Sequence, residues 1–166
     1  LLYYARRIAR LRESYPALVG KVPEDPYVIP FGQAEVKRPG EDVTVVATMM
    51  MVHKSVRVAE DLSKKGIGVE VIDPRTLVPL DRHTIMDSVK KTGKVVVVSE
   101  DCKTAGVAAE IATTIMEEAF DYLDAPVRRV SAIDVPIPYA PVLESTVIPQ
   151  EGHIAEAVLE LVGEKE

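Results

Sequence analysis

Three stretches rich in β-branched residues set the strongest limit on the fold of this chain. They read DVTVVAT at residues 42–48, GVEVID at 68–73 and KVVVVSE at 94–100, so their starts lie 26 residues apart. That spacing leaves room for one helix and two short loops between strands, the length of a βαβ unit. Nearly continuous valine is typical of strands buried on both faces, as in a parallel sheet.

The segments between these strands have the pattern of amphipathic helices. In the first, apolar residues recur at helical spacing from Val52 to Leu62, and two lysines precede Gly66 as a stop signal. The second helix is predicted to begin after Asp81 as its N-cap and to end at Gly93, again after two lysines.

Further elements extend the same alternation. A third helix is predicted after residue 106, a fourth strand at 125–132 and a final amphipathic helix over 154–162. Strands that alternate with helices predict an α/β fold: three layers, with a mostly parallel sheet and helices on both faces.

The N-terminal part has a different character. Residues 21–42 include four prolines and little periodicity, so we interpret residues 1–40 as an extended connector and residues 41–166 as the α/β domain. The chain begins LLYY, without an initiator methionine, and we expect it to be a piece of a longer protein.

Composition narrows the class of function. The net charge of −6 disfavours a nucleic-acid surface, and no apolar run is long enough to span a bilayer. A single cysteine excludes an internal disulfide framework, so we expect a reducing, cytoplasmic setting. Neither nucleic acid nor a membrane is an expected partner.

The strand-to-helix junctions lack the fingerprint of a phosphate site. The first junction, TMMMVHK, has no glycine, and the junction after residue 100 has only Gly106. Phosphate binding at such junctions uses a glycine-rich turn. The fold class resembles nucleotide-binding domains, but fold alone does not decide function.

One junction nevertheless holds candidate chemistry. Cys102, the only cysteine, follows Glu100 and Asp101 at a strand end, where open α/β sheets often bind ligands. A cysteine nucleophile needs a nearby histidine, and adjacent strand residues usually point apart. The interpretation we favour is that the two carboxylates cap the following helix.

The histidines do not complete a catalytic set. His53, His83 and His153 each fall near a predicted helix start, and we interpret them as satisfied or solvated side chains. Composition and spacing alone therefore favour an assembly or regulatory module over an enzyme.

Several stretches, taken in order, resemble one family. They are KVPEDPYVIPFGQAEV (21–36), GEDVTVVATMMMVHKSV (40–56), GVEVIDPRTLVPLD (68–81), VKKTGKVVVVSED (89–101) and DVPIPYAPVLESTVIPQ (134–150). Together they are similar to the C-terminal part of the β subunit of thiamine-diphosphate-dependent 2-oxoacid dehydrogenases. These are the decarboxylase components of pyruvate, branched-chain 2-oxoacid and acetoin dehydrogenase complexes.

The resemblance implies a domain like the C-terminal domain of transketolase, preceded by a pyrimidine-binding domain. Thiamine diphosphate and Mg²⁺ belong to the complete enzyme, where the cofactor lies between the α subunit and the preceding β-subunit domain. The resemblance therefore assigns no catalytic, cofactor-binding or metal-binding residue to this chain, and predicts that it is inactive alone. It implies a cytoplasmic location, or the mitochondrial matrix in a eukaryote.

The partners implied by the resemblance are the α subunit, a second β subunit and the acyltransferase core. That core docks through a small basic domain, for which Asp121 and Asp124 in EEAFDYLDAP are the predicted contacts, with few cations nearby in the sequence. Glu100 and Asp101 are further candidate partner contacts.

Self-association is expected through the apolar TMMMV junction and the proline-rich segment 134–141. The alternative left open is a free-standing α/β regulatory or ligand-binding module.

Overall fold

The computed structural model describes residues 28–163 of the chain. The α/β fold belongs to the unit of the chain that begins at residue 31. Most of the connector predicted for residues 1–40 therefore lies outside the described residues.

Five strands form one sheet in the order β1-β3-β2-β4-β5. They are β1 (Glu35–Arg38), β2 (Val43–Ala47), β3 (Val69–Asp73), β4 (Val95–Cys102) and β5 (Arg128–Ala132). β2 pairs in parallel with β3 and β4, and β4 pairs in parallel with β5, whereas β1 is antiparallel to β3. The three valine-rich stretches are the three central strands, as predicted.

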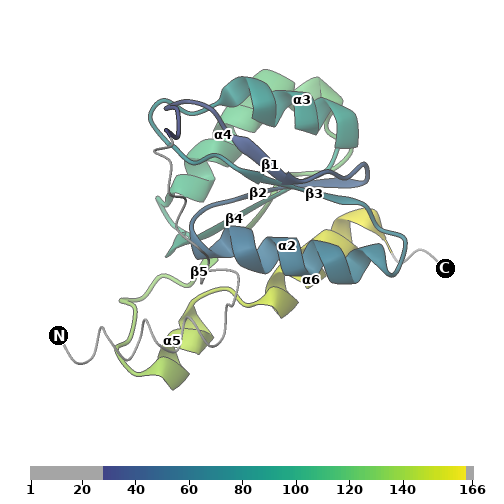
Figure 1. The fold of residues 1–166 in the computed structure, drawn as a ribbon. Helices are drawn as coiled ribbons and strands as arrows, with labels where there is room; N and C mark the ends of the chain where they lie inside the picture. Colours follow the sequence, from purple (N-terminus) through teal and green to yellow (C-terminus); the bar gives the residue numbers. More distant parts are fainter. Residues whose placement is uncertain (1–27, 164–166) are drawn as a thin grey trace. The chain divides into compact units, whose positions relative to one another are not determined.

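Helices cover both faces of the sheet (Figure 1). α2 (Met50–Ser63) and α6 (Glu151–Val162) pack on one face, and α3 (Arg82–Thr92) and α4 (Val107–Ala119) pack on the other. The predicted three-layer, mostly parallel α/β fold is confirmed.

Alternation along the central strands produces two hydrophobic cores. Val43 and Val45 belong to the core under α2 and α6, whereas Val46 and Ile72 belong to the core under α3 and α4. Successive side chains of a strand point to opposite faces, so a strand covered on both sides is apolar at nearly every position, with buried polar exceptions such as Thr44 and Glu70. This is why the strands are continuous valine runs.

The helix boundaries follow the predicted signals. The backbone N–H of Thr84 donates to Asp81 Oδ1 at 3.1 Å, which makes Asp81 the N-cap of α3. Gly93 ends the same helix in the left-handed conformation, with φ of 65°. A glycine adopts that conformation without the steric cost of a Cβ atom.

One strand and one α-helix were not predicted. β1 lies within the segment interpreted as a connector, where EVKR is too short and too polar to give a strand pattern. Charged side chains are typical of an edge strand, because they discourage pairing with other chains. The second element is α5 (Pro141–Val147), which begins with proline at a first-turn position inside the proline-rich segment.

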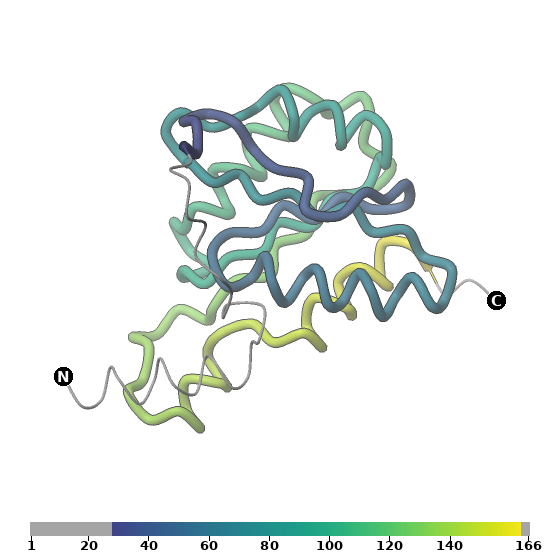
Figure 2. Tube along the Cα trace, viewed as in Figure 1, coloured from purple at the N-terminus to yellow at the C-terminus, as the bar shows by residue number. Residues whose placement is uncertain are grey.

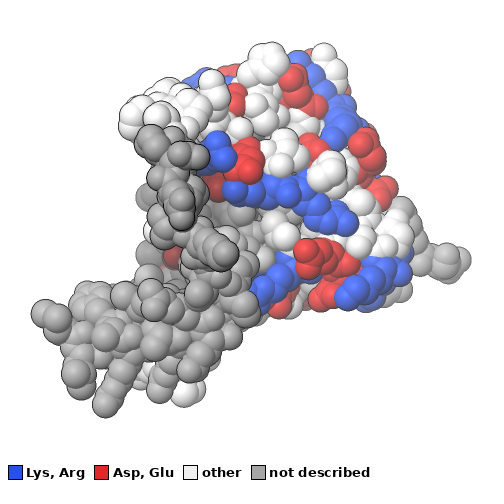
Figure 3. Space-filling model, in the orientation of Figure 1, with Lys and Arg blue, Asp and Glu red and all other residues white. Residues whose placement is uncertain are grey.

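No helix within residues 28–163 is both long and apolar enough to cross a membrane. Basic and acidic side chains are interspersed on the face seen in Figure 3.

Candidate functional site

The carboxyl ends of the central strands meet at a pocket of about 220 Å³. Its lining residues come from the ends of β2, β3 and β4 and the start of α4, and are Thr48, Met49, Asp73, Pro74, Arg75, Leu77, Glu100, Asp101 and Val107. The chain leaves β2 for β3 on one side, and β4 lies on the other. This is the topological switch point at which open α/β sheets bind ligands.

The pocket does not fit a diphosphate. Three of its polar side chains are carboxylates, and its arginine, Arg75, is paired with Glu35. Met49 precedes α2 where a phosphate site would have glycine, and that helix start has no side-chain cap. Phosphate cradles combine a glycine-rich turn with the positive end of a helix. The residues of this pocket therefore do not suit the thiamine diphosphate that the family resemblance implies.

Metal ligation is likewise not provided by the described part of the chain. Within residues 28–163, no three His, Cys, Asp or Glu side chains are grouped so that they could hold an ion.

Asp101 caps α4. The backbone N–H of Val107 donates to Asp101 Oδ2. The close approach depends on Gly106, where a Cβ atom would lie 2.1 Å from the carbonyl oxygen of Cys102 and 2.5 Å from Asp101 Oδ2. The helix-cap interpretation is confirmed for Asp101, and its contact with a partner stays a prediction.

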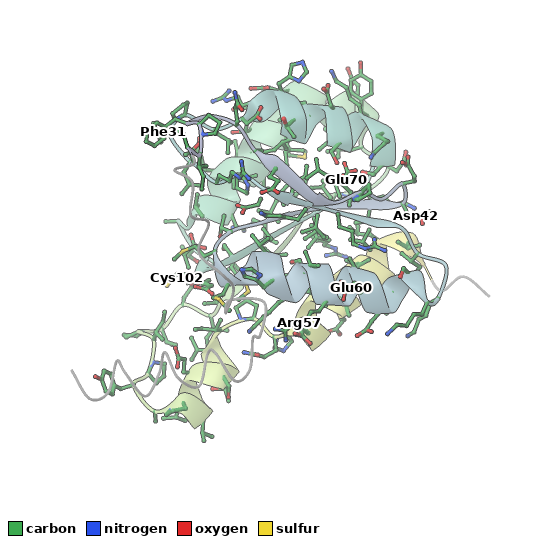
Figure 4. The ribbon with its side chains drawn as sticks, in the orientation of Figure 1. Phe31, Asp42, Arg57, Glu60, Glu70 and Cys102 are labelled. Atoms are coloured by element: carbon green, nitrogen blue, oxygen red, sulfur yellow. The ribbon has the colours of Figure 1, made fainter. Side chains whose placement is uncertain are left out.

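The contacts found for Cys102 and the histidines do not pair the cysteine with a histidine that could activate it. Cys102 is exposed at the end of β4, and Figure 4 shows it at one end of the sheet. His83 Nδ1 lies 3.0 Å from Asp87 Oδ2. The Gln150 N–H donates to His153 Nδ1 at 3.1 Å and so closes a capping box at the start of α6. His83 and His153 therefore have local partners, as we interpreted them.

The acidic segment after α4 is not one helix face. α4 ends at Ala119, and a 3₁₀ turn, η2 (Phe120–Tyr122), contains Asp121. Asp124 follows the turn, and its N–H donates to the Gly93 carbonyl at 2.8 Å. The segment is thus fastened to the end of α3.

α3 also supplies the cations that the sequence around this segment lacks. Arg82 forms an ion pair with Glu118, and Lys90 Nζ lies 5.3 Å from the centroid of the Tyr122 ring. Part of the acidic charge is therefore balanced across the two helices, which sequence order alone did not reveal.

The four predicted partner contacts fall into two separate places. Glu100 and Asp101 lie at the carboxyl end of β4. Asp124 lies beside Gly93, two residues before β4 at its opposite end, and Asp121 lies three residues before Asp124 in η2. Because these two places lie toward opposite ends of β4, we do not expect one small partner domain to contact all four residues.

Sequence analysis missed a buried lysine near the pocket. Lys54, in the first turns of α2, is 6% exposed, and its Nζ donates to the Pro149 carbonyl at 2.7 Å and to Gln150 Oε1 at 3.0 Å. A lysine among polar residues at a helix start gives no sequence signal of burial.

Several exposed apolar side chains of the described residues lie between β5 and α6. We call residues 133–149, which include α5, the arm. Figures 1 and 2 show α5 set off from the sheet and its four covering helices. The apolar arm residues that are at least two-fifths exposed are Ile133, Val135, Ile137, Tyr139, Val142 and Leu143.

The described residues form a mixed α/β domain. The carboxyl ends of its central strands lack the glycine-rich turn of a phosphate site, and its arm exposes apolar side chains. The family model described as the C-terminal domain of transketolase matches residues 32–154. The chain belongs to the transketolase C-terminal domain family.

Curated relatives narrow the group further. The chain is 42% identical over 145 residues to the acetoin:2,6-dichlorophenolindophenol oxidoreductase subunit beta of Bacillus subtilis, which covers 87% of this chain and 42% of that protein. It is 49% identical over 137 residues to the pyruvate dehydrogenase E1 component subunit beta of Rickettsia felis, covering 82% and 42%. The chain spans less than half the length of these relatives.

A solved structure has the same architecture. The chain superposes with a TM-score of 0.72 and 28% identity on a split-gene transketolase described as an inactive beta4 tetramer, over 89% of this chain and 47% of that one.

Proposed function

We propose that this domain is the C-terminal assembly domain of the β subunit of a thiamine-diphosphate-dependent 2-oxoacid dehydrogenase. The complete enzyme decarboxylates a 2-oxoacid oxidatively on thiamine diphosphate with Mg²⁺ and transfers the acyl group to a lipoyl arm. Its partners are an α subunit, a second β subunit and an acyltransferase core, in the cytoplasm or the mitochondrial matrix. The similarity to the β subunits named as an acetoin:2,6-dichlorophenolindophenol oxidoreductase and as a pyruvate dehydrogenase E1 component supports this proposal.

The observation that carries the assembly role is the exposed apolar side of the arm. Val142 is 77% exposed and Tyr139 is 68% exposed, and both belong to one continuous segment. Soluble domains rarely leave contiguous apolar patches uncovered, and such patches mark protein interfaces. We assign the arm to contact with a second β subunit; the tetramer named for the split-gene transketolase supports this assignment.

The test is the association state of the chain across a concentration range. Sedimentation velocity is expected to show concentration-dependent dimers for the wild type and monomers for a Val142→Glu, Leu143→Glu double variant, because two carboxylates cannot be desolvated in an apolar contact. Val78→Glu is the matched control, since Val78 is 91% exposed but lies outside the arm. A wild type that stays monomeric at high concentration, or a control that also dissociates, contradicts the assignment.

The chain alone is expected neither to bind thiamine diphosphate nor to decarboxylate a 2-oxoacid. Its carboxylate-lined pocket and the absence of glycine before α2 motivate this expectation. Calorimetric titration with thiamine diphosphate and Mg²⁺ checks it, and a saturable, stoichiometric heat would refute it.

The second candidate function is a ligand-binding module, favoured by the pocket at the switch point. The association experiment separates the two, because a free-standing ligand-binding module does not need the arm to dimerise. In an assembly domain, the Val142→Glu, Leu143→Glu variant loses its contact with the second β subunit, although its pocket is unchanged.

A further inference from the structure

A single buried cation fastens the arm to the body of the domain. Lys54 projects from α2, and both of its hydrogen-bond acceptors, the Pro149 carbonyl and Gln150 Oε1, lie at the junction between the arm and α6. Residues 54 and 149 are far apart in sequence, so this contact fixes where the arm leaves the body.

Gln150 extends the contact into the arm. Its side-chain Nε2 donates to the Ile148 carbonyl at 2.7 Å and to the Ser145 carbonyl, in the last turn of α5, at 3.1 Å. Because the Gln150 side chain also accepts from Lys54, its orientation is fixed from both sides. The position of α5 is therefore coupled to Lys54 through one amide.

The other end of the arm has a more exposed fastening. Asp134 Oδ1 accepts from the Thr104 N–H at 2.9 Å, and Asp134 Oδ2 accepts from the Thr104 hydroxyl at 2.6 Å. Water competes for exposed hydrogen bonds, whereas a buried donor has no alternative partner. Lys54 is therefore the stricter of the two constraints.

The charge on Lys54 is costly for folding. Burial lowers the pKa of the Lys54 ammonium, a shift that the carboxylates of Glu100, Glu151 and Glu144 oppose and that the neighbouring Arg57 reinforces. A lysine whose pKa is lower in the folded state binds fewer protons there, so the stability of the fold rises with pH between the lowered pKa and the usual one. At neutral pH the ammonium thus subtracts from stability, and an apolar side chain of similar length would avoid that cost.

We propose that Lys54 is a positioning residue for the arm: it holds α5 in the orientation in which the apolar arm side chains can bind a second copy of this chain. The inference rests on the proposed assembly function. What an apolar side chain cannot supply is the directed pair of donors to Pro149 and Gln150.

The test compares three variants of the full chain. Lys54→Met removes the donors and keeps the length of the side chain, Lys54→Arg restores donors, and Lys64→Met is the control, an exposed lysine at the end of the same helix. Hydrogen exchange of the α5 amides, measured at a dilution where the chain is monomeric, is expected to be about tenfold faster in Lys54→Met and close to wild type in Lys54→Arg and Lys64→Met.

Two further readouts separate positioning from general stability. Urea unfolding of Lys54→Met is expected to show an undiminished midpoint, while its dimer dissociation constant, from sedimentation, rises about tenfold. If Lys54→Met does not fold, Gln150→Ala replaces it, because it removes the amide that links Lys54 to α5 without altering the buried charge, while the bond from Lys54 to the Pro149 carbonyl remains. Unchanged α5 exchange in the folded variant overturns the proposal. If the wild type never dimerises but α5 exchange is still faster in Lys54→Met, then Lys54 holds the arm in place and the arm is not the assembly surface.

Discussion

The body of the domain, which is the sheet with its four covering helices, and the arm differ in which groups they bury. In the body, polar groups are buried and paired: Thr44 Oγ1 lies 2.6 Å from Ser88 Oγ and 2.8 Å from Thr92 Oγ1, and Glu70 accepts from Ser88 and Lys91. Figure 4 shows Glu70 between the sheet and α3. In the arm, apolar groups are exposed, and of the apolar residues in α5 only Val147 is buried.

The difference separates what folds the domain from what it offers to a partner. The body pairs most of its buried polar groups internally, as a self-contained unit must. Among the described residues, Ser55 Oγ and Asp101 Oδ1 are the buried side-chain atoms without a hydrogen-bond partner. The arm leaves apolar side chains in contact with water. Covering them with another surface lowers the free energy of the system, so they favour association. Mutations should therefore act on unfolding in the body and on association in the arm.

The comparison is tested most strongly by truncating one isoleucine in each region. Ile111 is 1% exposed in the core under α3 and α4, and Ile137 is 52% exposed in the arm. Ile111→Ala is expected to lower the free energy of unfolding by about 2–5 kcal/mol, because it removes buried methyl groups and leaves a cavity. Ile137→Ala is expected to change it by less than about 0.5 kcal/mol. Urea titration of both variants measures this, and equal losses would break the division.

The buried polar network gives the next largest effect. Glu70→Gln retains the shape but replaces one carboxylate oxygen by a donor that cannot accept from Ser88 or Lys91. We expect a loss of about 1–3 kcal/mol, since a buried group is left without its partner. Glu118→Gln is the control, because its ion pair with Arg82 is exposed and such pairs contribute about 0–1 kcal/mol. Urea midpoints that fall equally in both variants would contradict a special role for burial.

The body was readable from sequence because its signals are local. The valine runs, the Asp81 cap and the glycine at 93 each act within a few residues, and each was found where predicted. Fold class follows from such signals, because the alternation of strands and helices leaves few ways to bury their apolar faces.

The missed features depend on contacts between distant residues. β1 is a strand because its backbone pairs with β3, not because EVKR has a strand pattern. Lys54 is buried only because residues 149–150 return to α2. The pairing of α3 cations with the acidic segment likewise needs the packing of α3 on α4. No local pattern encodes any of these.

A smaller effect is expected at the N-cap of α3, with a defined pH dependence. Partial burial alone would raise the pKa of Asp81, but hydrogen bonds from the Ala34 N–H and from Thr84 outweigh it and lower the pKa. A lowered folded-state pKa gives stability that is present above the unfolded pKa of about 3.9 and is lost as the pH falls toward the folded value.

Asp81→Asn keeps a capping oxygen but removes the charge, and is therefore expected to lower the free energy of unfolding by about 0.3–1 kcal/mol at pH 7, where the carboxylate is ionised at the positive end of α3. The difference from wild type should shrink below about pH 4, because the carboxylate of the unfolded chain then binds a proton that the folded state, with its lowered pKa, does not yet bind. Urea unfolding at pH 7 and pH 3.5 measures it. A difference that is constant over this range would show that the charge of Asp81 contributes nothing.

The smallest expected effect concerns a partner that binds the body rather than the arm. Asp124 lies beside Gly93, near the end of β4 opposite the pocket, and Asp121 lies three residues earlier in η2. We predict that Asp121→Asn with Asp124→Asn weakens capture of the basic binding domain of the acyltransferase core. The loss should be about threefold, because rim charges act mainly on the association rate and are screened by salt. Surface plasmon resonance with the complete β subunit, at low and high salt, measures both the affinity and its salt slope.

The matched control is Asp61→Asn, an exposed carboxylate on α2 that pairs with Lys64. If the double variant and the control have the same affinity and slope as wild type, the acidic turn is a solvated end of the body. Docking of the core must then be sought at Glu100, at Asp101 or on the arm. A flatter salt slope in the double variant alone supports a second interface on the body, outside the arm and independent of its apolar surface.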